Sequence, residues 1–96
     1  MNRKNELNLG DAIDKFLDDY RLRNKYDENY ILSNWETLMG KTIARHTKSL
    51  RIKDKKIYIS IEYAALRQEL SFSKEKILSI LNQNFKEPVI KEVIIC

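Results

Sequence analysis

The spacing of apolar residues changes along the chain and predicts which segments form helices and which form strands. From Leu9 to Tyr20 the apolar positions recur every three or four residues, which is typical of one face of an amphipathic helix. Asp11 is the predicted N-cap, because a carboxylate can accept a hydrogen bond from an otherwise unpaired backbone amide. Residues 1–6 are polar and predict a frayed start, and the polar stretch 21–29 predicts a loop.

A second helix is predicted to begin between Asp27 and Asn29 and to end at Gly40. One side of this segment carries apolar residues at helical spacing: Ile31, Trp35 and Leu38. Glycine adopts a positive φ without a Cβ clash, so Gly40 fits the C-terminal stop. Lys41 then adds a positive charge beside the negative end of the helix dipole.

The letters Gly40-Lys41-Thr42 also resemble the end of a phosphate-binding loop, whose pattern is G-x-x-x-x-G-K-[ST]. The early glycine that lets such a loop curl around phosphate is Trp35 here, and the chain has only two glycines. A phosphate loop also follows a strand, whereas the residues before Gly40 show helical spacing. We therefore interpret these letters as the end of a helix and expect no nucleotide site.

From Leu50 the period of the apolar residues becomes two, which predicts a β-hairpin. Isoleucines and a leucine alternate with polar residues in two short runs, and Asp54-Lys55 joins them. One face of the hairpin is aliphatic, and the other presents Arg51, Lys53 and Tyr58. A basic and aromatic surface of this kind suits nucleic acid.

The last third of the chain predicts two helices and a strand. The segment 64–70 favours helix, a break is expected at 71–73 with Ser73 as a cap, and a second helix runs toward Phe85. Pro88 ends the helical region, since the residue before proline avoids the α conformation. The β-branched residues from Val89 to Ile95 then predict a third strand that joins the hairpin.

These elements predict an α+β fold in the order helix, helix, strand, strand, helix, helix, strand. A three-stranded sheet with helices on one face is a two-layer arrangement, and a hairpin followed by helices and a returning strand is KH-like. A chain of 96 residues is expected to form a single domain.

Charge is concentrated in one part of the chain. The net charge is +4, but residues 41–56 contain seven basic residues and one acid. Such clustering is expected of a surface that meets phosphates or an acidic partner. The alternative is that the lysines only solubilise an exposed hairpin edge. The candidate nucleic-acid-binding residues are Lys48, Arg51, Lys53, Lys55, Lys56 and Tyr58.

The inventory of reactive residues argues against catalysis and against a bound cofactor or metal. Cys96 is the only cysteine and His46 the only histidine, so neither a disulfide framework nor a multi-histidine site is expected. No leader or membrane span is recognisable, which predicts a cytoplasmic protein. Trp35 is assigned to the core and His46 to a structural hydrogen bond, and Glu62 and Glu69 are expected to be solvated.

An ordered set of residues across positions 9–95 resembles the DciA family of bacterial replicative-helicase loaders. The set comprises Trp35, Gly40, Ile43-Ala44, His46-Thr47, the alternating hairpin, "AALRQEL" from Ala64 to Leu70, Leu81-Asn82 and the closing "VIKEVII". Two features are expected to set this chain apart from the family: Leu66 stands where many members have tryptophan, and the long extra segment that many members carry is expected to be lacking.

The resemblance implies a KH-like domain that binds the hexameric replicative helicase and helps load it on DNA without hydrolysing ATP itself. Single-stranded or duplex DNA is the second expected partner, contacted through the basic hairpin. The surface that meets the helicase is placed around Leu66, Arg67 and Phe72, because Leu66 occupies the family's usual tryptophan position. The alternative hypothesis is a general KH-like RNA-binding module in translation or RNA processing, although the G-x-x-G loop of such modules is missing.

Overall fold

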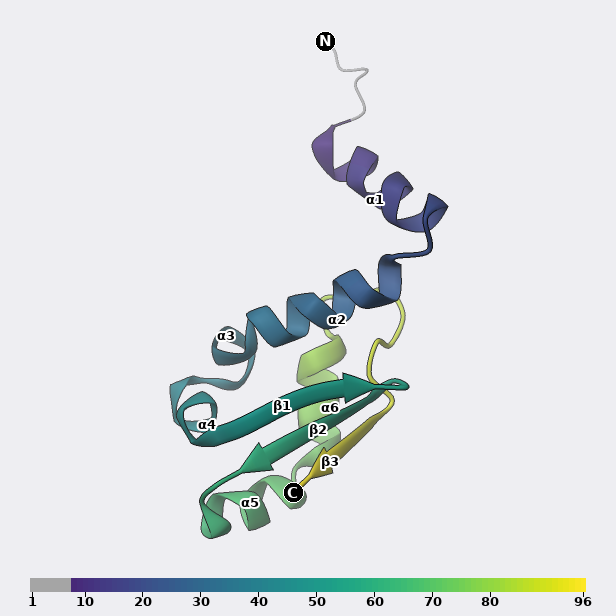
Figure 1. Cartoon of the computed structure of the whole chain (residues 1–96). Coiled ribbons are helices and arrows are strands. Elements are labelled where there is room, and N and C mark those ends of the chain that lie inside the picture. The colour runs from purple at the N-terminus through teal and green to yellow at the C-terminus, as the bar shows by residue number, and fades with distance from the viewer. Residues whose placement is uncertain (1–7) are drawn as a thin grey trace.

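The computed structural model describes residues 8–96 as a three-stranded sheet backed by helices (Figure 1). The elements are α1 (Leu9–Asp19), α2 (Arg23–Ser33), α3 (Trp35–Met39), α4 (Lys41–His46), β1 (Thr47–Lys53), β2 (Lys56–Ile61), α5 (Ala64–Ser71), α6 (Lys74–Asn82) and β3 (Glu92–Ile95). The predicted α+β class and the order of helical and strand segments are confirmed. α1 matches the first predicted helix, the second predicted helix corresponds to α2 and α3, and α4 is a further short helix. The frayed start predicted at residues 1–6 lies outside the described residues.

The cap of α1 is Asn8 and not the predicted Asp11. The Asn8 side-chain carbonyl accepts a hydrogen bond from the Asp11 backbone N–H at 2.8 Å. Asparagine satisfies a free amide of the first turn as well as aspartate does. Asp11 instead lies inside the first turn, where its charge favours the positive end of the helix dipole.

The loop predicted at 21–29 is wrong over most of its length, because α2 begins at Arg23. A positive φ of 55° at Arg21 separates α1 from α2. Polar residues fill the first two turns of α2, so the apolar pattern gave no sign of a helix there. Contacts outside α2 compensate, since Arg23 reaches two aspartates of α1 and the rings of Tyr30 and Phe85 meet edge to face at 5.8 Å.

Gly40 ends α3 with φ at 92°, as predicted for a glycine stop. The chain then enters α4 at once, so Gly40 is also the residue before a second short helix. Lys41 lies beside the C-terminal end of α3, as predicted, and is also the first residue of α4, where a positive charge is unfavourable. The segment contains no phosphate-binding loop, since α3 and not a strand precedes the glycine.

β2 is the central strand of the sheet. It pairs antiparallel with β1 and parallel with β3. The hairpin turn is Asp54-Lys55, as predicted, and both residues have positive φ, which matches the twist of the flanking strands. The Lys91 backbone N–H donates to the Lys55 carbonyl at 2.7 Å, so the segment before β3 is tied to the turn.

The core lies between the sheet and the helices, and in Figure 1 α6 crosses behind the strands. Its buried side chains are Ile31, Trp35, Ile57, Ile59, Ile61, Leu70, Ile77, Leu81, Val89, Ile90 and Val93. The predicted core position of Trp35 is confirmed, because the side chain is only 7% exposed. Its indole N–H donates to the Thr47 hydroxyl at 3.0 Å, and that hydroxyl donates to the Ile43 carbonyl at 2.7 Å.

The predicted break between the last two helices is confirmed at Phe72 and Ser73. Ser73 precedes α6, but its side chain makes no cap hydrogen bond. The hydroxyl instead lies 3.4 Å from the Glu69 carbonyl of the preceding helix. α6 thus begins without the predicted capping contact and is held by Ile77 and Leu81, which are buried.

Asn82 fastens the segment that leads from α6 to β3. Its Oδ1 accepts the backbone N–H groups of Val89 and Ile90 at 2.8 and 3.0 Å, and its Nδ2 donates to the Ile90 carbonyl at 2.9 Å. Val89 and Ile90 are buried, so water cannot easily replace these bonds. One side chain therefore sets where β3 begins.

We predict that Asn82→Ala lowers the free energy of unfolding by about 2 to 3 kcal/mol, because two buried amides lose their acceptor. For a chain of this size the melting temperature should fall by roughly 10 °C or more. Thermal denaturation followed by circular dichroism measures the change. Asn84→Ala is the control, since Asn84 is exposed. Equal melting temperatures for the two variants would contradict the assigned role of Asn82.

Candidate nucleic-acid interface

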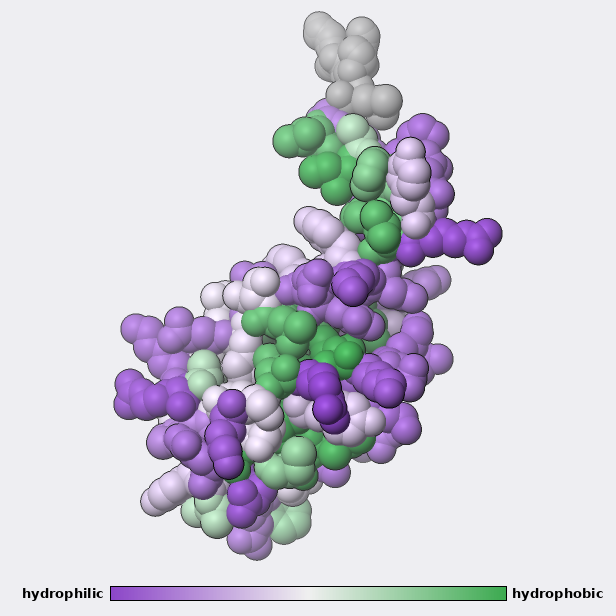
Figure 2. Space-filling model, in the orientation of Figure 1, coloured by the Kyte–Doolittle hydropathy of each residue, from purple (hydrophilic) through white to green (hydrophobic). Residues whose placement is uncertain are grey.

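The face of the sheet opposite α6 is not covered by a helix and turns toward the viewer in Figure 1. The strand register arranges its side chains in rows across the sheet. Arg51 pairs with Tyr58, which pairs in turn with Ile94. Figure 2 shows the same face with hydrophilic side chains set among smaller hydrophobic patches. We call this surface the open sheet face.

A second row on the open sheet face is charged. Lys53 pairs with Lys56, and Lys56 pairs with Glu92 of β3. The Lys56 ammonium lies 3.8 Å from the Glu92 carboxylate, and both side chains are about half exposed. An exposed pair of this kind contributes little to stability. Lys56 can therefore exchange Glu92 for another anion at small cost.

Arg51 and Tyr58 form a cation–π pair in the first row. The guanidinium carbon of Arg51 lies 4.9 Å from the centre of the Tyr58 ring. Such a contact stabilises and orients the arginine, while its outer N–H groups remain free to donate. Arg51 covers the ring of Tyr58. A ligand at this surface would therefore meet the arginine before it could stack on the tyrosine.

The tip of the hairpin carries three lysines of the predicted set. Lys53 and Lys56 flank the turn, and Lys55 lies in it. The topology adds two lysines that sequence reasoning missed. Lys91 is tied to the turn through the carbonyl of Lys55, and Lys86 lines the same groove as Lys55. Only the parallel return of β3 brings these two lysines to the hairpin, so the linear charge pattern did not reveal them.

Lys48 lies apart from this group, at the start of β1 beside α4. A register irregularity between Thr47 and Ser49 surrounds it. The exposed cations Lys41 and Arg45 of α4 are its neighbours in sequence. The basic segment 41–56 therefore presents one group of cations at the α4 end of β1 and another at the hairpin tip, with Arg51 between them.

The three residues expected to meet a partner differ in exposure. Leu66 is half-buried and packs against the core. Arg67 donates from its guanidinium to the Ile61 carbonyl at 2.7 Å, which ties it to the end of β2. Phe72 is 82% exposed at the turn between α5 and α6. Of the three, Phe72 alone is fully available for contact.

His46 has a structural environment. Its Nδ1 lies 3.6 Å from a carboxylate oxygen of Glu62, and its ring stacks on Tyr63 with centroids 5.6 Å apart. The Glu62 N–H also donates to the His46 carbonyl at 3.1 Å. These contacts join α4 to the end of β2. Glu62 and Glu69 are exposed, as expected for solvated carboxylates.

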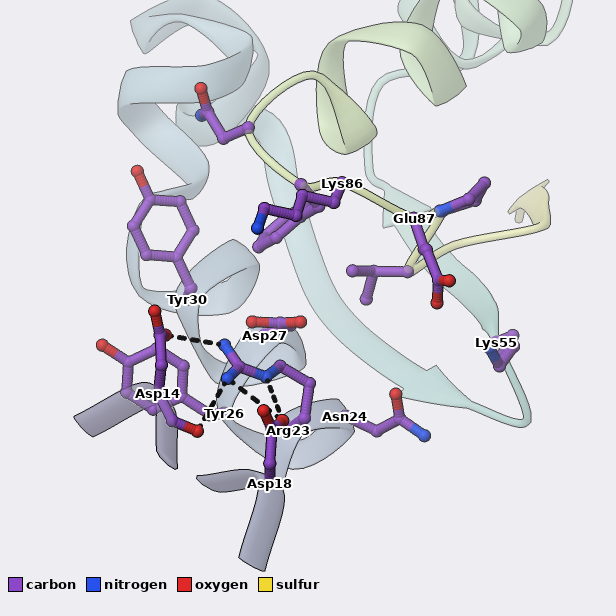
Figure 3. A pocket seen from close by; sticks show the side chains of 14 residues that line it. Asp14, Asp18, Arg23, Asn24, Tyr26, Asp27, Tyr30, Lys55, Lys86 and Glu87 are labelled. Atoms are coloured by element: carbon purple, nitrogen blue, oxygen red, sulfur yellow. Dashed lines mark hydrogen bonds and ion pairs between the residues drawn. The ribbon is translucent and has the colours of Figure 1, made fainter. Parts of the chain in front are cut away.

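A groove lies between α1, α2, the hairpin turn and the segment 84–89 (Figure 3). At its centre the Arg23 guanidinium donates to the carboxylates of Asp14 and Asp18 at 3.2 Å and to the Asp14 carbonyl at 3.1 Å. Burial raises the pKa of the Asp27 carboxyl, although Arg23 acts to lower it. Since aspartates already pair with it, Arg23 is not available to bind an anion. It holds α1 in place.

Within residues 8–96, no group of three or more histidine, cysteine or acidic side chains is arranged to hold a metal ion. No helix in that range has both the length and the apolar character needed to cross a bilayer.

The chain matches a family model and a curated relative. The family model described as "Dna[CI] antecedent, DciA" matches residues 8–95. A UPF0232 protein of Corynebacterium glutamicum (strain R) is 34% identical over 64 residues, which cover 67% of this chain and 36% of that protein. The chain thus spans little more than a third of the length of this curated relative. No solved structure matches the chain.

We predict that the hairpin tip supplies contacts to nucleic-acid phosphates. A triple variant, Lys53→Glu, Lys55→Glu and Lys56→Glu, should bind single-stranded DNA more weakly, because it removes three cations and adds three anions. The slope of log affinity against log salt should fall in magnitude by about 2, at roughly 0.7 per lost contact. Fluorescence anisotropy with a labelled oligonucleotide at several salt concentrations measures both quantities.

The matched control changes three exposed lysines elsewhere: Lys25→Glu, Lys74→Glu and Lys76→Glu. It alters the net charge equally but leaves the hairpin intact. If both triple variants lose the same affinity and the same salt slope, overall charge and not the hairpin tip determines binding.

Proposed function

The chain belongs to the DciA family, and on that premise we propose that it is a non-enzymatic adaptor of bacterial DNA replication. It binds the hexameric replicative helicase through one surface, contacts DNA through the basic hairpin, and helps place the helicase on the strand. The DciA family is associated with that helicase in replication. The adaptor then only positions the helicase, and the helicase itself supplies the energy for translocation.

The observation that supports the DNA contact is the open sheet face. Arg51, Lys53 and Lys56 stand on it in adjacent rows, and the family model matches the whole sheet. Contacts from separate lysines and one arginine to phosphates favour binding without sequence preference. A loader that acts wherever replication begins needs that kind of contact, because it follows the helicase and not a base sequence.

The rival function, a KH-like RNA-binding module, has less support. A KH clamp requires a glycine-rich loop between two helices so that the backbone can approach phosphates. The corresponding turn between α5 and α6 contains Phe72 and Ser73 and no glycine. A phenylalanine that is 82% exposed would stand between the backbone and the phosphates.

We predict that the immobilised chain retains purified replicative helicase of the same organism with a dissociation constant in the low micromolar range, roughly 1 to 10 μM, as is usual for transient complexes. Addition of the chain should speed the loading of helicase on single-stranded DNA, measured as ATP-dependent unwinding of a forked duplex. The chain alone should show no ATP hydrolysis. Absence of helicase binding at tens of micromolar, together with a clear preference for RNA over single-stranded DNA, would favour the RNA-binding function.

A further inference from the structure

α1 projects from the body of the protein and leaves most of its apolar face uncovered (Figure 1). Leu17 is its single buried residue. The other apolar side chains are exposed to 77% at Leu9, 40% at Ile13, 52% at Phe16 and 65% at Tyr20. Figure 2 shows hydrophobic side chains gathered along one side of this helix and hydrophilic ones along the other. We call Leu9, Ile13, Phe16 and Tyr20 the α1 stripe.

The α1 stripe has the spacing of a helix that docks in a groove. Its residues stand at i, i+4, i+7 and i+11, so they form one continuous line along three turns. The rings of Phe16 and Tyr20 contact each other with centroids 4.6 Å apart and form the largest part of the line. A contiguous exposed apolar stripe on a small protein marks an interaction site.

Local interactions hold α1 as a helix although it buries so little of itself. An isolated helix of 11 residues is marginal in water. Asn8 caps its start, Lys15 pairs with Asp19 at 3.4 Å, and Arg23 of α2 binds Asp14 and Asp18. The Leu22 N–H also donates to the Leu17 carbonyl at 2.8 Å. The stripe is thus already ordered in the free protein, and this preorganisation lowers the entropic cost of binding a partner.

A second copy of the chain is a poor occupant for the stripe. Two α1 helices would meet over about 16 Å of length through four side chains each. A contact of that size buries well below the roughly 800 Å² per partner of a stable interface. Each α1 carries four aspartates and one lysine, and even with Arg23 of α2, which pairs with Asp14 and Asp18, the net charge is −2, so two copies would repel each other. The same acidic flanks favour a groove with a basic rim.

We propose that α1 is the docking helix through which this protein binds the replicative helicase, by inserting the α1 stripe into a helix-lined apolar groove bordered by lysine or arginine side chains. The inference rests on the proposed function for the identity of the partner. It moves the partner surface from the region of Leu66, Arg67 and Phe72 to α1, which lies at the other end of the molecule from α5 (Figure 1).

The test measures the affinity of the labelled full chain for purified helicase by fluorescence anisotropy. The variant Phe16→Ser, Tyr20→Ser should lose about tenfold or more in affinity, because exposed anchor rings of this kind carry much of an interface's energy. The matched control is Phe72→Ser, which removes an even more exposed ring from the former candidate surface and should change affinity less than twofold. Circular dichroism and thermal melting confirm that each variant is folded.

Charge provides a second, independent readout. Ala12→Glu makes α1 more acidic and should strengthen binding by about twofold to fivefold at low salt, whereas Ala12→Lys should weaken it by a similar factor. Ala12 is exposed and belongs neither to the stripe nor to the ion pairs of α1. Changes in affinity of the opposite sign would contradict a basic rim around the groove of the partner.

The outcomes separate the two proposals. If the unchanged chain binds helicase and the Phe16/Tyr20 variant binds equally well, the docking role of α1 is refuted while the adaptor function stands. If only Phe72→Ser weakens binding, the partner surface lies at the α5–α6 turn. If sedimentation shows a dimer of the unchanged chain that the Phe16/Tyr20 variant abolishes, the occupant is a second copy. If the unchanged chain does not bind helicase, the proposed function fails and this inference fails with it.

Discussion

The alternation of side chains along β2 is the constraint on which the rest of the structure depends. Ile57, Ile59 and Ile61 are almost completely buried, and because successive side chains of a strand point to opposite faces, the residues between them must face away from the helices. β2 is the central strand, so the same phase extends to both neighbours. It directs Arg51 of β1 outward opposite Tyr58 and places Glu92 of β3 beside Lys56. A slip of one residue would bury cations, which makes the register strongly specified.

Local sequence patterns predicted the elements whose conformation depends mainly on neighbouring residues. The hairpin followed from period two and a polar turn, and Gly40 from the need for positive φ. The sequence did not reveal the parts that depend on distant partners. α2 begins with polar turns and is supported by Arg23 and Tyr30 through contacts to α1 and Phe85. The position of β3 depends on the hydrogen bonds of Asn82, which no periodicity records.

The candidate site was likewise predictable where local alternation decides the position of a side chain, and not where a distant segment does. Alternation sufficed to place Arg51, Lys53 and Tyr58 on the uncovered face. It did not show that Arg51 would cover the Tyr58 ring, or that the return of β3 would bring Lys91 to the hairpin turn. Exposure was the least predictable property. The stripe of α1 has the same spacing as a core-facing helix, and only the angle between α1 and α2 leaves it in solvent.

The separation of charge between the two candidate surfaces has a functional consequence. α1 carries three more acids than bases, whereas the hairpin tip and the open sheet face are basic. If the two proposals hold, nucleic acid is repelled by one surface and attracted by the other, so a bound strand would not compete with a protein partner for α1. The clamp between Arg23 and the aspartates fixes the direction in which α1 leaves the body. An adaptor with this geometry can hold a protein and a strand at the same time, each on a surface that disfavours the other.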